Sequence, residues 1–280
     1  MSTSFAPLPT RASPGAAVAS TTTESIRFMP TPQQAYLMRI GDSCLIHAQR
    51  LAEWSGHAPI LEEDIALTNL ALDLVGQARA LLTHVGRQTG FDEDQLAFLR
   101  GERDFFNFTL TELPGRRAGR DFADAVVRNF LLSAWMNVLW AKLEQSADAE
   151  VAAIAGKAVK ESRYHVAHSA DWVVRLGDGS EESTRRMRQA VDRLWPYAAE
   201  LFETDAVDTA AAESGLGPVR AALRVGWQAI VEPVFADAGL AIPASGAFRS
   251  TGSRGVHSEH LGYMLAEMQT LQRSFPGGQW

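Results

Sequence analysis

The segment spanning residues 125–143 (AVVRNFLLSAWMNVLWAKL) places the strongest constraint on what this 280-residue chain can form. Its apolar residues surround most of a helical circumference, which predicts a helix buried on several sides. The segment contains no carboxylate, and the nearest acids, Asp124 and Glu144, stand just outside it. Neutral Asn and Ser side chains are poor ligands for hard or borderline metals. Any carboxylates for a metal must therefore come from other helices.

Charge and cysteine content exclude several classes of protein. The formal net charge of −7 argues against a broad nucleic-acid-binding surface, because no basic stripe would follow the phosphates. Cys44 is the only cysteine, so no intrachain disulfide can form and nothing favours a secreted protein. We see no apolar run that approaches the length needed to cross a bilayer. The prediction is a cytoplasmic protein without nucleic-acid or membrane partners.

The chain divides into a tail and one helical domain. Residues 1–27 are rich in Ser, Thr, Ala and Pro without periodicity, which predicts a disordered N-terminal tail. Residues 28–280 alternate long amphipathic segments with short turns, which predicts a single all-α domain, an antiparallel helical bundle with additional C-terminal helices. We expect helices over residues 32–54, 60–85, 121–145, 148–176, 181–204, 217–238 and 257–273. Thr31 and Gln34 predict a capping box at the first, and Pro233 should kink or end the sixth.

The helix expected over residues 148–176 carries the strongest site signal. Glu161, His165 and His168 lie on one of its faces, bracketed by apolar residues that should point to the core. A buried, unpaired carboxylate costs several kcal/mol, so Glu161 needs a cation, a hydrogen-bond donor or a metal. A satisfied polar network is the favoured interpretation, and a metal site is the alternative.

Two further helices offer weaker candidates. In the helix over residues 60–85, Asp73 could project inward, although three residues later Gly76 has no side chain to coordinate a metal. The line of polar residues through this helix also fits its solvated face. In the first helix, Asp42 and Glu53 lie at the margin of the apolar face, where we expect acids to be solvated.

Three long runs carry a family resemblance: EWSGHAPILEEDIALTNLALDLVGQARALL, KESRYHVAHSADWVVRLGDGSEESTRRM and GVHSEHLGYMLAEMQTLQRSFPGGQW. Over about residues 33–280, the chain resembles the non-catalytic structural subunits of the bacterial phenylacetyl-CoA 1,2-epoxidase, the multicomponent ring epoxidase of aerobic phenylacetate degradation. The resemblance implies a ferritin-like fold. It also implies that the chain binds and stabilises a homologous catalytic subunit with a di-iron site. A small accessory subunit and a flavin and iron–sulfur reductase would complete the complex, with no cofactor in this chain.

The same resemblance implies a degenerate di-metal site. Two helices of an active relative each give a Glu-x-x-His pair. Those pairs align here with Asp73 and Gly76, and with Ser162 and His165, so one pair lacks its imidazole and the other its carboxylate. Glu161 is one position away, about a hundred degrees around the helix. We therefore expect no catalytic residue and no metal ligand, but a vestigial pocket lined by Asp42, Asp73, Gly76, Glu161, Ser162, His165 and His168.

A side-chain charge could take the place of the metal charge in that pocket. Lys157 stands four residues before Glu161, the spacing of an ion pair on one helix face. Two other functions stay open. One is an autonomous di-metal carboxylate oxidase that uses Asp42, Asp73, Glu161, His165 and His168. The other is a helical adaptor unrelated to oxygenases.

Overall fold

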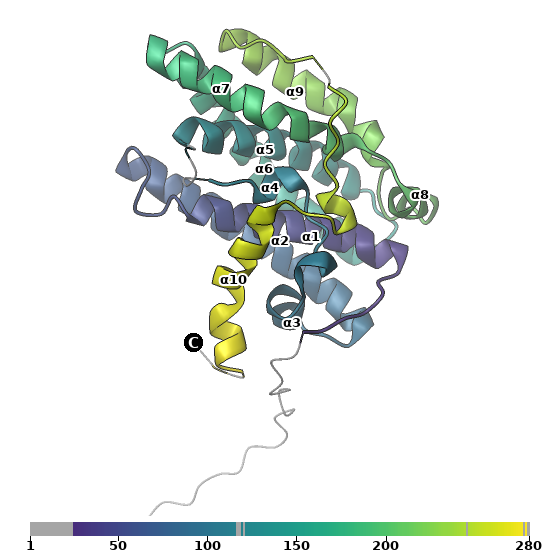
Figure 1. Ribbon diagram of the computed structural model, residues 1–280. Coiled ribbons are helices and arrows are strands. Elements are labelled where there is room, and N and C mark those ends of the chain that lie inside the picture. Colours follow the sequence, from purple (N-terminus) through teal and green to yellow (C-terminus); the bar gives the residue numbers. More distant parts are fainter. Residues whose placement is uncertain (1–24, 116–118, 120, 245, 277, 279–280) are drawn as a thin grey trace, which may run out of the picture.

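The computed structural model describes residues 25–115, 119, 121–244, 246–276 and 278. Within them the chain forms ten α-helices, drawn in Figure 1, and no strand beyond two isolated bridges. The α-helices are α1 (Pro32–Ala52), α2 (Leu61–Thr89), α3 (Glu93–Phe98), α4 (Thr109–Glu112), α5 (Phe122–Leu143), α6 (Ala149–Gly177), α7 (Glu181–Ala198), α8 (Ala206–Glu213), α9 (Arg224–Asp237) and α10 (Glu259–Ser274). The predicted all-α class is confirmed.

The helix ends follow the local signals in the sequence. Thr31 caps α1, and its side chain and that of Gln34 form the predicted capping box, with Pro32 in the first turn. Asp121 and Asp148 cap α5 and α6 by accepting hydrogen bonds from backbone N–H groups of the first turn. Gly90 ends α2 in the left-handed conformation that favours glycine. These caps place all four long helices within a few residues of their predicted bounds.

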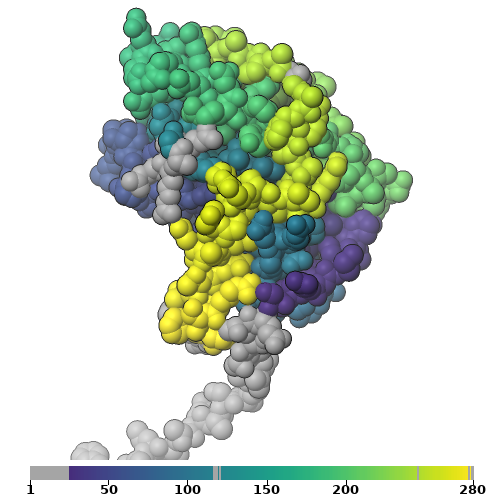
Figure 2. Space-filling model, viewed as in Figure 1, coloured from purple at the N-terminus to yellow at the C-terminus, as the bar shows by residue number. Residues whose placement is uncertain are grey.

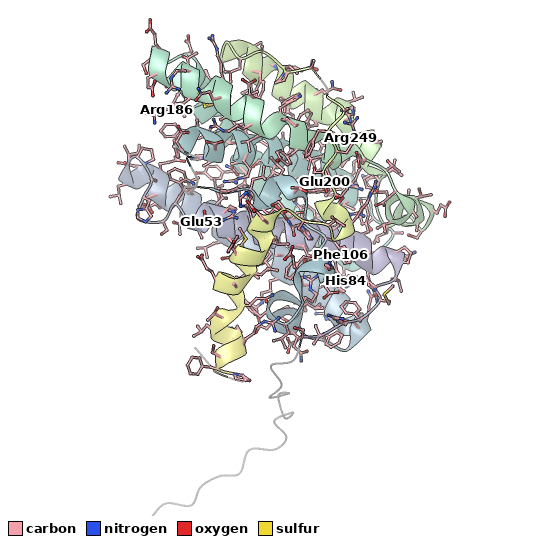
Figure 3. The ribbon with its side chains drawn as sticks, in the orientation of Figure 1. Glu53, His84, Phe106, Arg186, Glu200 and Arg249 are labelled. Carbon is pink, nitrogen blue, oxygen red and sulfur yellow. The ribbon has the colours of Figure 1, made fainter. Side chains whose placement is uncertain are left out.

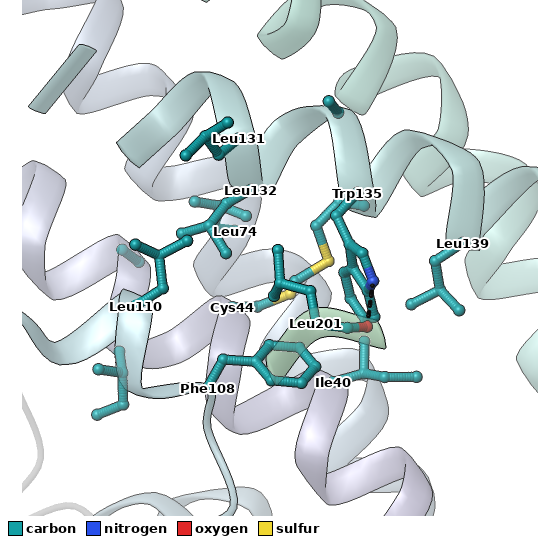
Figure 4. Close-up of a cluster of buried hydrophobic side chains, with 14 of the residues drawn as sticks. Ile40, Cys44, Leu74, Phe108, Leu110, Leu131, Leu132, Trp135, Leu139 and Leu201 are labelled. Carbon is teal, nitrogen blue, oxygen red and sulfur yellow. Dashed lines mark hydrogen bonds between the residues drawn. The ribbon is translucent and has the colours of Figure 1, made fainter. Parts of the chain in front are cut away.

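Helices α1, α2, α5 and α6 form the bundle that houses the candidate site. Short turns join α1 to α2 and α5 to α6, so the members of each pair run antiparallel. Helix α5 is buried along most of its length, as predicted, and Trp135 and Trp140 are among the largest fully buried side chains. Figure 4 shows Trp135 in the hydrophobic core, where its indole N–H donates to the Leu201 carbonyl at 2.9 Å. The core thus continues from the bundle into the segment after α7.

The C-terminal third covers the bundle. Helices α7 and α9 lie on one side of it and α10 on the other (Figure 1), joined by a segment that crosses the visible face of the molecule (Figure 2). Two buried carboxylates hold that segment. Glu200, labelled in Figure 3, accepts from the Ser253 N–H at 2.7 Å, and Glu112 accepts from the His257 imidazole at 2.7 Å. Ser258 caps α10, and its side chain accepts from the His260 N–H.

Two predictions at the helix ends need correction. Helix α9 begins at Arg224, after a 3₁₀ turn, rather than at residue 217, and it continues past Pro233 to Asp237, close to its predicted end. Trp227, Val231 and Phe235 are buried on both sides of Pro233, and their packing offsets the hydrogen bond that the proline cannot donate. The helix expected over residues 181–204 is α-helical only to Ala198 and continues as a 3₁₀ turn.

The predicted disordered tail lies outside the described residues up to residue 24. Beyond that point the prediction is wrong, because the Ile26 N–H donates to the Leu99 carbonyl at 2.9 Å and its side chain packs on the core. One further expectation needs revision. By length and composition, α2 is apolar enough to cross a membrane, and 44% of its most apolar stretch is buried inside the protein. The helix packs against α1 and α6 as part of the bundle.

Candidate functional site

Polar side chains from all four bundle helices meet inside the bundle. Most are buried, and they form hydrogen-bonded pairs and short chains rather than converging on one point. Among the described residues, Nδ1 of His47, Nδ1 of His168 and Oε1 of Glu63 are buried without a hydrogen-bond partner. The residues are Cys44 and His47 of α1, Glu63, Asp73 and Gln77 of α2, Asn129, Ser133 and Asn137 of α5, and Glu161, Ser162, His165 and His168 of α6. We call these twelve residues the polar pocket.

His165 and Asp73 form the pair nearest to the middle of α6. His165 is buried, and its Nε2 lies 3.0 Å from Asp73 Oδ2 on α2. Burial lowers the pKa of His165 below its usual value, and the hydrogen bond and charge of Asp73 only partly oppose this effect. The imidazole is therefore neutral near pH 7 and donates its Nε2 proton to the carboxylate. The structure brings together these two predicted residues and satisfies both.

Glu161 belongs to a hydrogen-bonded chain across three helices. The Cys44 thiol donates to Gln77 Oε1 at 3.6 Å, and Gln77 Nε2 donates to Glu161 Oε2 at 3.0 Å. The Lys157 ammonium lies 3.3 Å from Glu161 Oε1, which confirms the predicted ion pair. The Lys157 side chain is 78% exposed, so this pair sits at the edge of the pocket. Solvent screening leaves it little net effect on stability.

His168 binds a carboxylate that was not among the predicted site residues. Its Nε2 lies 2.9 Å from Oε2 of Glu63, and the Trp172 indole N–H donates to the same oxygen at 2.6 Å. Glu63 is buried, whereas its neighbour Glu62 is exposed. The signal was present in the sequence, because Glu63 precedes the buried Leu67 by four residues and so shares its helix face.

His47 is a second pocket residue that was not predicted. It lies on the buried face of α1 between Cys44 and Leu51, and its Nε2 donates to Asn129 Oδ1 of α5 at 3.1 Å. Burial, reinforced by the nearby positive charge of Arg128, lowers the pKa of His47 to about 3. Ser133 Oγ donates to the same Asn129 oxygen at 3.3 Å. In the middle of α5, amide and hydroxyl groups thus serve as the polar partners, in a segment without carboxylates.

Two predicted pocket residues point elsewhere. Asp42 is fully buried, contrary to the expectation of a solvated acid, and both of its oxygens bind the Arg100 guanidinium. The N–H of Phe106, labelled in Figure 3, also donates to Asp42 at 2.9 Å. Asp42 precedes Cys44 by two residues, so its side chain lies about 200° around α1 from that of Cys44. It therefore lies on the helix face that contacts residues 100–106. Gly76 is exposed at the mouth of a groove between α2 and α6.

The Ser162 hydroxyl makes hydrogen bonds to two helices of the bundle. It accepts from Asn137 Nδ2 at 3.1 Å and donates to the Val159 carbonyl at 3.1 Å, so its hydrogen bonds link α5 to α6. The donor set does not fit a two-metal carboxylate centre, which needs four carboxylates and two imidazoles. Among the residues that the structure describes, no three His, Cys, Asp or Glu side chains converge closely enough to hold one metal ion.

Four antiparallel helices that enclose a polar pocket, with further helices packed on both sides, define an all-α ferritin-like bundle protein. The chain belongs to the phenylacetic acid catabolic protein family, whose profile matches residues 19–280. It is 47% identical over 247 residues to one of the subunits of the 1,2-phenylacetyl-CoA epoxidase of Escherichia coli (strain K12). The match covers 88% of this chain and 98% of that relative, so the family resemblance seen in the sequence is confirmed.

Proposed function

We propose that this chain is the structural, non-catalytic subunit of a multicomponent phenylacetyl-CoA 1,2-epoxidase in the cytoplasm. It binds and stabilises a homologous catalytic subunit, which holds the di-iron centre. A small accessory subunit and a flavin and iron–sulfur reductase complete the assembly. Family membership, and the match to the Escherichia coli epoxidase subunit along nearly its whole length, support the assignment to this enzyme.

The observation that supports the structural role is that each carboxylate of the polar pocket already accepts a hydrogen bond from another side chain, although Oε1 of Glu63 has no partner among the described residues. Asp73 accepts from His165, Glu63 accepts from His168 and Trp172, and Glu161 accepts from Gln77. Each carboxylate that could ligate a metal therefore already has a donor. A bound metal would have to displace these hydrogen bonds. The residues of the pocket do not supply the four carboxylates and two imidazoles whose bonds to a metal pair could offset that loss. The pocket is thus suited to holding helices together.

A structural subunit acts by burying surface of its partner. Obligate hetero-oligomers commonly bury about 2,000 Å² or more in total, which is a large apolar contribution for a chain of this size. Binding to the folded partner alone raises the folded fraction of that partner by mass action. The catalytic subunit produced alone is therefore expected to be insoluble or inactive, and co-expression with this chain is expected to restore it.

The test is co-purification, with stoichiometry and iron measured in the same sample. The two subunits should elute together, and the iron should follow the catalytic subunit, while this chain expressed alone should hold far less than one iron. A matched variant, Asp73→Asn, keeps an acceptor for His165 but removes the charge. Complexes with this variant should keep turnover within about twofold, since a lost ligand would cost orders of magnitude.

Two results would contradict the proposal. Near-stoichiometric iron and dioxygen-dependent turnover in the isolated chain would indicate an autonomous di-metal oxidase. Failure to capture any epoxidase subunit from phenylacetate-grown cells would instead indicate an unrelated helical adaptor.

A further inference from the structure

A pocket of about 310 Å³ lies between α7, α9 and the segment that follows α9. Arg249, labelled in Figure 3, belongs to that segment. The pocket shares no residue with the polar pocket, and its volume is at the small end of the range of ligand sites, about 300–1,000 Å³. We call it the aromatic pocket, after the four ring-bearing residues on its lining: Trp195, Phe202, Trp227 and Phe248.

The rings of the aromatic pocket come from three separate parts of the chain. Trp227 and Phe202 are buried, with ring centroids 5.0 Å apart, and form the inner wall. Trp195 of α7 is half-buried and lies 5.5 Å from Trp227. Phe248 is 50% exposed and forms an outer wall. Aromatic rings at such distances gain more than area burial alone, so this lining favours a ligand with a flat aromatic ring over an aliphatic one.

Arg224 supplies a cation for the charged end of such a ligand. Its guanidinium carbon lies over the Phe202 ring, 4.4 Å from the centroid. Within the described part of the chain, the exposed Arg224 side chain makes no ion pair and no hydrogen bond. A guanidinium held over a ring keeps its N–H edge for a carboxylate, which it can bind through two parallel hydrogen bonds.

The other charges of the aromatic pocket limit how many negative charges a ligand can carry. Arg249 Nε lies 3.2 Å from Glu203 Oε1, and Nη1 donates to the Gly246 and Phe248 carbonyls at 2.7 Å each. Arg249 is therefore largely occupied in holding its own segment. Asp192 is exposed and is the only acid among the described lining residues. One available cation and one repelling carboxylate suit a ligand with a single negative charge.

We propose that the aromatic pocket binds a small aromatic monocarboxylate. The ring of the ligand lies among Trp195, Trp227 and Phe248, and its carboxylate pairs with Arg224. Phenylacetate, the acid that hydrolysis of a phenylacetyl thioester releases, is the probe of choice. That choice rests on the proposed function, whereas the class of ligand rests on the pocket alone. Binding to the folded chain also raises its stability by mass action.

Isothermal titration calorimetry of the full-length chain, alone and in the co-purified complex, measures the binding. A ligand as small as phenylacetate should bind with a Kd between about 10 µM and 1 mM. Phenylacetamide keeps the ring and shape but not the charge, and should bind at least about tenfold more weakly. Cyclohexylacetate keeps the charge without the aromatic ring and should bind at least about threefold more weakly.

Two variants should change the affinity for phenylacetate in opposite directions. Arg224→Met keeps a side chain of similar length without the charge and should weaken binding at least about tenfold. Asp192→Asn removes a repelling charge and should tighten binding at least about twofold. Both residues are exposed, so the variants should fold, which circular dichroism verifies. Arg185→Gln, at an exposed arginine of α7 outside the lining, is the matched control and should leave the affinity unchanged.

Several outcomes would overturn the proposal. Equal affinities for phenylacetate and phenylacetamide would show that no cation reads the carboxylate. Binding that neither Arg224→Met nor Asp192→Asn alters would place the ligand elsewhere. Coenzyme A bound more tightly than any carboxylate, and weakened by Arg224→Met, would show that the pocket takes a polyanion.

Two further carboxylates separate this inference from the proposed function. Benzoate and indole-3-acetate belong to the same chemical class and have no connection with a phenylacetyl-CoA epoxidase. If either binds in an Arg224-dependent manner while phenylacetate does not, the aromatic pocket stands and the proposed function loses support. If none of the three acids binds the folded chain, the inference is wrong, and the proposed function is unaffected.

Discussion

Replacing Asp42 tests whether this acid holds the fold or belongs to a metal site. Asp42 and Arg100 are both fully buried, and the carboxylate also accepts from the Phe106 N–H. Breaking a buried pair by removing one charge typically costs about 3–5 kcal/mol, because the other charge stays buried and uncompensated. Asp42→Asn keeps an acceptor for Phe106, and Arg100 keeps the Asp104 carbonyl at 2.7 Å. We therefore expect the lower end of this range, about 3 kcal/mol.

Urea unfolding followed by circular dichroism measures this loss. With an unfolding slope of about 2–3 kcal/mol per molar urea, the midpoint should fall by about 1 M. The matched control is Arg87→Gln, which breaks an exposed ion pair with Glu150 and should cost less than about 1 kcal/mol.

A double-mutant cycle with Arg100→Met identifies the cause. Two residues in one buried ion pair should show a coupling free energy above about 1 kcal/mol, so the double variant should lose less than the sum of the singles. Additive losses, or an Asp42→Asn loss below about 1 kcal/mol, would refute the assignment of Asp42 to a structural ion pair. A change in bound iron without a change in stability would favour a metal site.

Three other perturbations probe titratable groups of this fold. Burial opposes the charged form of His257, but the hydrogen bond and charge of Glu112 and the hydrogen bond to the Phe105 carbonyl outweigh burial and raise the pKa of His257. The stability that protonated His257 contributes to the fold is therefore complete below about pH 6.5 and is lost as the pH rises through the folded-state pKa. His257→Gln should remove that pH dependence from urea midpoints measured between about pH 6 and 9. Lys157→Gln should change the free energy of unfolding by less than about 1 kcal/mol, because the Lys157 ammonium is mostly exposed. A loss of several kcal/mol would instead show that Lys157 replaces a buried metal charge. The His47 ring, with a pKa of about 3, should show no NMR titration between about pH 5 and 9, and Asn129→Asp should move its titration upward, which an unchanged spectrum would contradict.

Periodicity was sufficient to predict the bundle. The apolar stripes and the capping residues fix the long helices, because both signals are local in the sequence. The pair formed by Lys157 and Glu161 was predictable for the same reason, since four residues on one helix bring side chains together. The order of the helices then placed α2 and α6 side by side, which is why Asp73 and His165 meet.

Partners that come from irregular segments were not predictable. Asp42 was expected in solvent because Arg100 is 58 residues away in the chain and carries no periodic signal. Glu63 was not predicted either. It is buried whereas its neighbour Glu62 is exposed, because one residue turns a side chain by about a hundred degrees around the helix. His47 followed the buried face of α1, so its spacing from Cys44 and Leu51 was an available signal that was not used.

The geometry of the pocket also predicts that adding a carboxylate at Ser162 and an imidazole at Gly76, the ligands that the family resemblance predicts to be missing, should not create a metal centre. Ser162→Glu would put a carboxylate into the core beside Asn137, where an unpaired charge costs several kcal/mol. Gly76→His would project into the groove lined by Lys157 and Glu161, away from Ser162 and His165, which do not line it. The double variant should therefore be less stable than the parent chain and should bind less than one iron per chain by elemental analysis. Two irons in that variant would show that α5 need not supply a carboxylate, and the reasoning from its neutral middle segment would fail.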